Sequence, residues 1–332
     1  MRYITDTTEF QIEEPTIVTV GKFDGRHRGH QKLLRTMKEL KQELGYPTAI
    51  FTFSIAPLTQ MSGQPQTVIT TNMERRANME RMGIDYLVEY PFDEEIRRMS
   101  PEDFVKDILA GRMGAREIVV GPDCSFGYQG AGNAGLLKHM EKELGYRLHV
   151  IEKEKDHMRD ISSTYIREEL EKGNVEKANA LLGEPYSIHG KVVHGNHIGS
   201  SILGFPTANL EPPAMKRLPR FGVYVSRVLV DNVYYRGVTN IGKKPTVEGR
   251  YPVGVETYIF DLDRDIYGDT IEVQLLAFDR PEQKFASLEE LKQRIEMDKE
   301  FAAGYFEMHP EIEVAGRWKM AQPFRQRENA VK

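Results

Sequence analysis

The segment that most constrains the fold runs from residue 16 to residue 44, where a strand pattern passes into a helix pattern. Residues Thr16–Val20 are mostly β-branched, which predicts a buried parallel strand. Gly21 ends this run, and a polar loop follows. From Gln31 onward the apolar residues recur at helical spacing, at Leu33, Leu34, Met37, Leu40 and Leu44. We therefore predict a strand that leads through a loop into an amphipathic helix.

The loop of this unit carries two histidines, His27 and His30, three residues apart. At the entrance of a helix this spacing places both imidazoles on the same side. The free N–H groups and the positive dipole end of the helix attract anions at the same place. The pattern predicts a phosphate-binding corner. The alternative is a pair of surface histidines beside an ordinary helix cap.

The rest of the first half alternates between strand and helix patterns, after a lead-in or edge segment at residues 1–15. Predicted strands cover residues 48–53, 86–89, 117–120 and 147–151, and predicted helices cover 72–82, 101–109, 136–144, 161–170 and 174–182. This alternation favours a doubly wound α/β sheet with crossover helices. Because ligands bind beyond the carboxyl ends of such strands, we expect Gly21, Phe53 and Gly121 around one crevice.

A second anion-binding turn is predicted within residues 161–170, ISSTYIREEL. Ser163 or Thr164 is placed to cap the N-terminus of a helix, with Arg167 just inside it. A single turn here combines hydroxyls, free backbone amides and a guanidinium, and this combination favours the binding of an anion. An ordinary N-cap is the alternative, and the two interpretations are compatible.

Beyond Pro185 the pattern changes to strands without intervening helices. Predicted strands cover residues 186–193, 222–230, 234–240, 253–260 and 270–278, with a hairpin turn at residues 230–233. This favours a small antiparallel β-barrel, closed by a helix from Ser287 to about Phe301 that begins with a capping box. We therefore expect one domain at residues 1–184, a second at 185–310 and a tail at 311–332.

Composition narrows the class of protein. The chain of 332 residues has a formal net charge of −5, which argues against a large nucleic-acid surface. No apolar run approaches the roughly 18 residues of a membrane span, and the first residues lack the apolar core of a signal peptide. The single cysteine, Cys124, excludes an intrachain disulfide and a cysteine-based metal site. We expect a cytoplasmic protein that binds small molecules, as a monomer or a weak homo-oligomer.

Several of these patterns coincide with the motifs of a known family. Residues 21–30, GKFDGRHRGH, resemble the G-x-F-D-G-x-H-x-G-H signature of the bacterial bifunctional riboflavin kinase/FAD synthetases, and residues 161–167 resemble their S-S-T-x-I-R signature. In the second half, GFPTAN at residues 204–209 resembles the kinase signature. The resemblance covers residues 14–303. It implies an α/β plus all-β chain, with a Rossmann-like nucleotidyltransferase domain followed by a riboflavin kinase-like barrel.

The resemblance implies that the first domain transfers the adenylyl group of ATP to FMN, which yields FAD and pyrophosphate. His27 and His30 would hold the triphosphate, and Arg167 would neutralise the departing pyrophosphate. Further contacts with ATP would come from two loops, at Gly21, Phe23, Asp24, Gly25 and Gly29 and at Ser162, Ser163 and Thr164. Flavin contacts are expected at Phe53, Asp123 and Phe126.

By the same resemblance, the second domain transfers the γ-phosphoryl group of ATP to the 5′-hydroxyl of riboflavin. Thr207 and Asn209 would bind Mg²⁺ and the nucleotide, because oxygen ligands suit a hard cation that keeps most of its waters. Gly199 and Gly204 lie in a glycine-rich loop whose backbone N–H groups can approach phosphates. Glu256 would act as the general base for the attacking hydroxyl.

Three departures from the family pattern lie in the first domain. Ile55 and Ala56 replace residues of an F-x-P-H-P motif, Cys124 replaces an aromatic residue, and residues 128–132 lack a basic residue. They leave two alternatives to a bifunctional enzyme. One is a riboflavin kinase with a weak or re-purposed adenylyltransferase domain, and the other is a non-catalytic flavin-sensing regulator. Retention of Arg167 and Glu256 argues against the regulator, because a sensor needs neither a pyrophosphate site nor a base.

Overall fold

The computed structural model describes residues 1–54, 66–194, 207–243 and 253–313. The chain forms two compact units. The first contains Met1–Arg167, Leu181–Gly183 and Ala214–Arg217, and the second contains Glu168–Ala180, Glu184–Pro213 and Leu218–Lys332. The chain therefore enters the second unit at residue 168 and returns to the first unit twice, at residues 181–183 and 214–217. In the described ranges, no helix has both the length and the apolar character needed to cross a bilayer.

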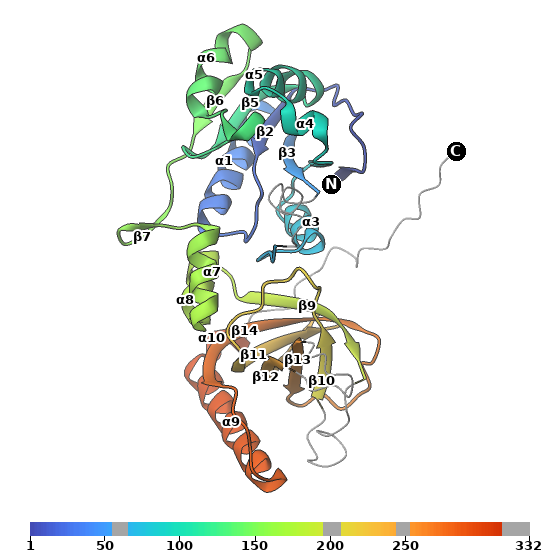
Figure 1. The fold of residues 1–332 in the computed structure, drawn as a ribbon, viewed down its shortest axis with the longest axis vertical. Helices are drawn as coiled ribbons and strands as arrows, with labels where there is room; N and C mark the ends of the chain where they lie inside the picture. Colours follow the sequence, from blue (N-terminus) through green and yellow to red (C-terminus); the bar gives the residue numbers. More distant parts are fainter. Residues whose placement is uncertain (55–65, 195–206, 244–252, 314–332) are drawn as a thin grey trace, which may run out of the picture. The chain divides into compact units, whose positions relative to one another are not determined.

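The first unit is built on the predicted parallel sheet (Figure 1). Its strands are β1 (Arg2–Thr5), β2 (Thr16–Val20), β3 (Thr48–Phe53), β4 (Tyr86–Tyr90), β5 (Ala115–Val120) and β6 (Arg147–Val150). Their order in the sheet is β1-β4-β3-β2-β5-β6. The direction of this order reverses between β2 and β5, which pair in parallel. Doubly wound sheets bind ligands at this switch point, beyond the carboxyl ends of the strands.

Helices cover both faces of the sheet because each buries one apolar stripe. Against one face lie α1 (Arg28–Leu44) and α3 (Asn72–Arg81), through Leu34, Met37 and Met79. Against the other lie η1 (Phe104–Arg112) and α6 (Ala134–Leu144), through Ile108, Leu137 and Met140. The strand and helix expected over residues 16–44 is confirmed.

Residues 101–109 are helical as predicted, with Pro101 in the first turn, but beyond Asp103 the helix is of the π type. α5 (Pro101–Asp103) passes into η1, a π-helix, after which the Met113 N–H donates to the Ile108 carbonyl five residues back, at 2.9 Å. Shorter elements complete the chain up to the barrel: α4 (Glu94–Arg98), η2 (Tyr128–Gly130), β7 (Lys155–Asp156), β8 (Arg159–Asp160), α7 (Ser163–Lys172) and α8 (Val175–Leu182).

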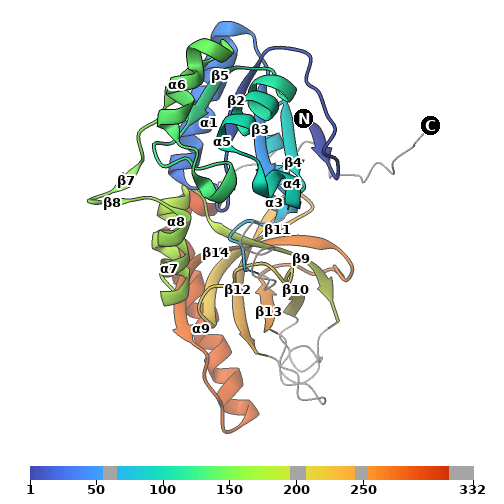
Figure 2. The same cartoon turned by 45° about the horizontal axis from the view of Figure 1, so that its top comes forward.

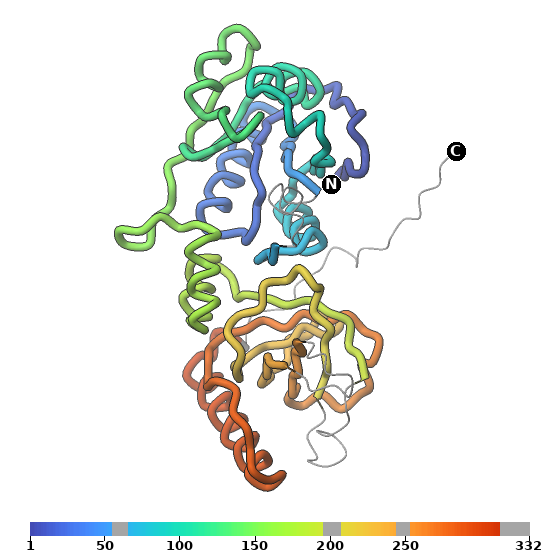
Figure 3. Tube along the Cα trace, viewed as in Figure 1, coloured from blue at the N-terminus to red at the C-terminus, as the bar shows by residue number. Residues whose placement is uncertain are grey.

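The second unit contains a closed antiparallel barrel, as predicted (Figures 2 and 3). Its strands are β9 (Tyr186–Val193), β10 (Thr207–Glu211), β11 (Gly222–Val230), β12 (Val233–Lys243), β13 (Val253–Ile259) and β14 (Thr270–Pro281). The predicted hairpin turn is present, because Asp231 and Asn232 both have positive φ angles, 46° and 65°. β10 was not predicted as a strand. α9 (Leu288–Met308) packs on the barrel through Ala302 and Phe306, and α10 (Pro310–Glu313) follows it.

A buried charge cluster joins α9 to the barrel. Asp298 of α9 is 3% exposed and accepts hydrogen bonds from Arg280 at 2.8 and 2.7 Å and from Arg294 at 3.0 Å. Asp279 of β14 has a buried Oδ2 atom with no hydrogen-bond partner among the described residues. Burial, and then the negative charge of Asp298, raise the pKa of Asp279 to about 6.

We expect Asp279→Asn to stabilise the second unit at neutral pH. Because the folded-state pKa is raised from 3.8, the wild-type carboxyl stabilises the fold below pH 3.8, and this stability is lost as the pH rises through about 6. The side-chain amide of asparagine does not ionise, so the variant does not lose stability as the pH rises. The free energy of unfolding should therefore rise by about 1–2 kcal/mol at pH 8 and by little at pH 4, measured by urea denaturation. Exposed Asp263→Asn is the control, and an equal effect at both pH values would contradict the prediction.

Candidate functional site

The loop between β2 and α1 brings the two predicted histidines into contact. His27 is the N-cap of α1, and its Nδ1 accepts a hydrogen bond from the backbone N–H of His30 at 3.4 Å. The Nδ1 of His30 donates to the Gly25 carbonyl at 3.0 Å. The two imidazole rings stack with their centroids 3.8 Å apart. The corner therefore presents a preformed pair of imidazoles at a helix N-terminus.

These hydrogen bonds assign the tautomers of the neutral rings. Because His27 accepts at Nδ1, its proton lies on Nε2, which can donate to an incoming anion. Because His30 donates at Nδ1, its Nε2 is an acceptor until it is protonated. Burial, and then the neighbouring His30, lower the pKa of His27 to about 2. Burial also lowers the pKa of His30 to about 4, against the opposing effects of the Gly25 carbonyl and Asp123.

The shape of the loop depends on residues of the predicted motif. Gly25 has a φ of 69°, and a Cβ there would lie 3.0 Å from the Ile69 side chain. Phe23 also has a positive φ, 49°, and is 2% exposed. Its ring centroid lies 4.9 Å from that of His30, so the buried phenyl ring supports the imidazole pair. Gly21 follows β2 directly, and a Cβ at Gly29 would lie 3.2 Å from the His27 ring.

The second predicted anion turn meets this loop at Asp24. The Ser163 hydroxyl donates to the Asp24 carbonyl at 2.5 Å, and the Arg167 guanidinium forms an ion pair with the Asp24 carboxylate. The prediction that Ser163 or Thr164 caps α7 is wrong. Ser162 is the cap, because its hydroxyl accepts from the Tyr165 N–H at 3.3 Å and its carbonyl from the Ile166 N–H at 3.1 Å. This frees Ser163 to bond the loop.

A third segment, which the sequence did not predict, completes the corner. The Thr70 N–H donates to Asp24 Oδ1 at 3.0 Å, and the Gly25 N–H donates to the Thr70 hydroxyl at 3.1 Å. Thr70 precedes α3, whose N-cap is Thr71. No local pattern in the sequence relates residue 70 to residue 24, because the contact exists only in the folded chain.

The three predicted flavin residues occupy different surroundings. Phe53 ends β3, and its ring meets Phe92 edge-on at 5.0 Å. Asp123 has an exposed side chain that lies 3.0 Å from the ammonium of Lys153. Phe126 is 7% exposed and stacks on Phe104 at 5.5 Å, in the core of the unit.

Cys124, which departs from the family pattern, is a partly buried residue. Burial, and then the charge of Asp123, raise the pKa of the Cys124 thiol to about 11, so it stays protonated at neutral pH. Cys124 is partly buried and packs against the apolar core, as a small apolar side chain does. Ile55 and Ala56 lie outside the described residues.

In the barrel, strand register brings two of the predicted kinase residues together. Asn209 of β10 is paired with Glu256 of β13, and Glu256 is paired on its other side with Asn240 of β12. Directly paired residues share one face of a sheet, and Thr207 shares it as well because it is two residues from Asn209. Asn209 is 6% exposed and Glu256 is half-buried. Asn240 is a neighbour that the sequence did not assign to the site.

The donor set on this face suits a hard cation. Thr207, Asn209 and Glu256 offer a hydroxyl, an amide oxygen and a carboxylate, which are ligands of the kind that Mg²⁺ binds. Within the described ranges, no three histidine, cysteine or acidic residues are grouped as a metal site. The predicted loop residues Gly199 and Gly204 lie outside the described residues.

The described part of the first unit also has an open depression of about 520 Å³ beside α4. Carboxylates dominate its lining, at Glu94, Glu95, Asp103 and Asp107. This negative charge disfavours a nucleotide, whose phosphates would be repelled. The depression shares no residue with the histidine corner.

The two halves of the chain match two protein families. The family described as FAD synthetase matches residues 9–165, and the family described as Riboflavin kinase matches residues 182–306. The bifunctional riboflavin kinase/FMN adenylyltransferases of Bacillus subtilis and Escherichia coli K12 are 35% and 34% identical to this chain. These alignments cover 88% and 89% of this chain and 92% and 94% of the relatives.

A solved structure is similar to this chain over most of its length. It is described as a macrolide-efflux protein from Streptococcus pneumoniae and is similar to this chain with a TM-score of 0.79 and 31% sequence identity. The similarity covers 91% of this chain and 98% of that one.

We expect the desolvated neutral histidines, His27 and His30, to make the first unit sensitive to acid. The folded-state pKa of His30 is about 4, below its ordinary value of 6.5, so between these values the unfolded chain binds the extra proton. The stability due to the neutral ring is therefore complete above pH 6.5 and is lost as the pH falls toward 4. In His30→Asn the slope of the unfolding free energy between pH 5 and 6.5 should be smaller by about 1 kcal/mol per pH unit.

Urea denaturation of the full chain at several pH values measures this slope. Asparagine keeps a donor near the position of Nδ1, so the Gly25 contact can persist. Exposed His139 on α6 supplies the control variant, His139→Asn. Equal slopes in wild type and His30→Asn would contradict the lowered pKa of His30.

Proposed function

Because the chain belongs to the family of bifunctional riboflavin kinase/FMN adenylyltransferases, we propose that it phosphorylates riboflavin to FMN and then adenylylates FMN to FAD. The observation that supports this proposal is that one chain carries both sets of residues that we assign to these reactions. The first unit has the His27–His30 pair with Arg167 at the switch point of its sheet, and the barrel pairs Asn209 with Glu256. We assign adenylyl transfer to residues 1–184 and phosphorylation to residues 185–310, and no role to residues 311–332.

In adenylyl transfer, a phosphate oxygen of FMN attacks the α-phosphorus of ATP and pyrophosphate leaves. The protein has little covalent chemistry to perform, so alignment and charge stabilisation carry the reaction. We assign the Nε2–H of His27 and the first amides of α1 to the triphosphate, with Gly21, Phe23, Asp24, Gly25 and Gly29 shaping the loop around it.

On the other side of the triphosphate we place the first turn of α7. Ser162, Ser163 and Thr164 bring hydroxyls there, and Arg167 brings the cation for the leaving pyrophosphate. A phosphate near His30 would stabilise its protonated form and raise its low pKa, so that the ring gains a second donor as substrate arrives. Flavin contacts are assigned to Phe53, Asp123 and Phe126.

In the kinase reaction, Glu256 accepts the proton of the ribityl 5′-hydroxyl as that oxygen attacks the γ-phosphorus of ATP, and ADP leaves as the bond to the bridging oxygen breaks. Register with Asn209 holds Glu256 on a rigid strand rather than on a loop. Thr207 and Asn209 are the residues that would hold Mg²⁺ with the nucleotide, and the cation would neutralise phosphate charge. Gly199 and Gly204 would approach the phosphates through their backbone N–H groups.

The cellular setting follows from the same proposal. We place the enzyme in the cytoplasm, as a monomer or a weak homo-oligomer that binds neither nucleic acid nor membrane. The net charge of −5 supports the absence of a nucleic-acid surface.

Incubation of the full chain with riboflavin, ATP and Mg²⁺, followed by chromatographic separation of the flavins, tests the proposal. We expect FMN to appear first and FAD to follow. FMN alone would support the riboflavin kinase with a weak or re-purposed first domain. Formation of neither product would support the flavin-sensing regulator.

We expect two single variants to separate the reactions. Glu256→Gln should lower FMN formation from riboflavin by about 10²–10⁴-fold, the range for loss of a general base, and leave FAD formation from FMN unchanged. Arg167→Met should do the reverse, with a loss of about 10²–10³-fold in FAD formation. Exposed Glu289→Gln serves as the charge-matched control. A variant that lowers both activities together would contradict the assignment of two separate sites.

A further inference from the structure

A short segment from the barrel half of the sequence is part of the first unit. Residues 214–217 follow β10 and precede β11, yet they pack with the first unit. The Val68 N–H donates to the Met215 carbonyl at 2.7 Å, and the Arg217 N–H donates to the Val68 carbonyl at 2.7 Å. This two-hydrogen-bond bridge seats the segment along the stretch that leads into α3.

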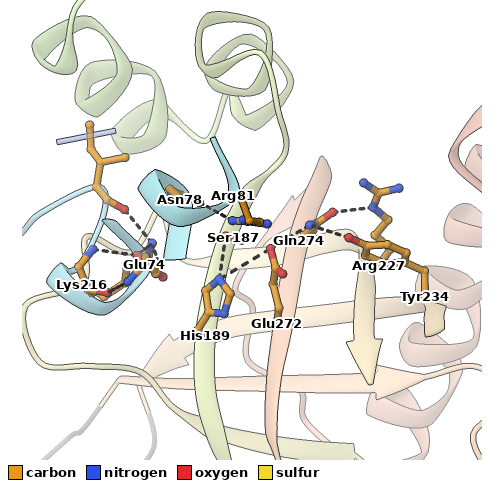
Figure 4. A network of polar contacts seen from close by, with 12 residues as sticks. Glu74, Asn78, Arg81, Ser187, His189, Lys216, Arg227, Tyr234, Glu272 and Gln274 are labelled. Carbon is orange, nitrogen blue, oxygen red and sulfur yellow. Dashed lines mark hydrogen bonds and ion pairs between the residues drawn. The ribbon is translucent and has the colours of Figure 1, made fainter. Parts of the chain in front are cut away.

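Lys216 is the buried centre of this segment. Its side chain is 2% exposed, and its ammonium donates to the Ile69 carbonyl at 2.7 Å and to the Glu74 carboxylate oxygens at 3.0 and 2.8 Å. Figure 4 shows the Lys216 and Glu74 side chains turned toward each other. A lysine is rarely buried to this degree without a partner of opposite charge, and here the partner is itself 7% exposed.

Glu74 connects Lys216 to the start of α3. The Thr71 N–H donates to Glu74 Oε2 at 2.8 Å, and the Glu74 N–H donates to the Thr71 hydroxyl at 3.3 Å, which together form a capping box. Lys216 therefore fixes residues 69 and 74 at once, on both sides of the N-cap.

Residues 69 and 70 in turn contact the histidine loop. The Ile69 side chain packs against Gly25, where a Cβ would lie only 3.0 Å away. Thr70 exchanges hydrogen bonds with Asp24 and Gly25, at 3.0 and 3.1 Å. The Gly25 carbonyl accepts from His30, so an unbroken series of contacts runs from Lys216 to the imidazole pair.

We propose that Lys216 is a positioning residue for adenylyl transfer, which acts by holding residues 69–71 against the loop that carries His27 and His30. This inference rests on the proposed function of the first unit. It means that the adenylyltransferase site needs a residue encoded within the kinase half of the chain. Lys216 touches no reacting atom, so its effect should appear as a displacement of the groups that do.

The test is Lys216→Met in the full chain, with both reactions assayed on the same preparation. Methionine keeps an apolar stem of similar length and removes the ammonium. We expect kcat for FAD formation from FMN to fall at least tenfold, because small displacements of aligned groups are costly in rate. Riboflavin phosphorylation should stay within twofold of wild type. Exposed Lys138→Met on α6 should leave both reactions within twofold.

A second variant separates positioning from simple stability. Lys216→Met leaves the Glu74 carboxylate buried without its ammonium partner, whereas Lys216→Met with Glu74→Gln removes both charges and keeps a capping-box residue. We expect the double variant to recover the melting temperature while kcat for FAD formation stays at least tenfold low. Recovery of melting temperature and kcat together, or a wild-type kcat in Lys216→Met, would overturn the inference.

The activity of the wild-type protein separates a failure of the proposed function from a failure of the role proposed for Lys216. A wild-type protein that makes no FAD from FMN overturns the proposed function and this inference with it. A wild-type protein that makes FAD, beside an unaffected Lys216→Met, overturns only the inference.

Discussion

The arrangement of the first site depends on one residue, Asp24, at which three distant segments meet. Its carboxylate accepts from the Thr70 N–H and pairs with Arg167, and its carbonyl accepts from the Ser163 hydroxyl. Hydrogen bonds to a charged group are among the stronger ones in proteins, so they fix the loop after β2 more firmly than its own backbone can. Phe23 and Gly25 both have positive φ angles, and these contacts maintain that backbone conformation beside the imidazole pair.

The two sites are built by different physical means. In the first unit, parallel strands end at one edge, and the strand order reverses between β2 and β5, which is where doubly wound sheets bind their ligands. In the barrel, antiparallel register alone sets Glu256 between Asn209 and Asn240. The first site therefore depends on contacts between distant segments and one loop, whereas in the barrel the neighbouring strands hold the carboxylate in place.

The sequence predicted those parts of the molecule that short-range patterns encode. The strand and helix around His27, the parallel sheet, the barrel and the turn at Asp231–Asn232 all follow from periodicity or local turn chemistry. The cap of α7 was misplaced by one residue because Ser162, Ser163 and Thr164 offer three equivalent hydroxyls, and only folding assigns one of them to Asp24. β10 was missed because five residues next to a Gly-Pro-rich loop carry too little pattern to indicate a strand. The role of Thr70 could not be predicted from the sequence, because its partner Asp24 lies 46 residues away in the chain and the two meet only after folding.

Because the chain passes back and forth between the two units, its gene cannot be divided cleanly between them. No single cut divides it into two pieces that each keep all of their own structure, because residues 168–180 and 214–217 lie on the wrong side of any break near residue 184. Gene fission at that point would give one product without residues 214–217, which include Lys216, and another without residues 168–180, although these residues belong to its unit. Recombination at that point would likewise place residue 216 of one parent beside Glu74 of the other, across the ion pair that joins the two positions.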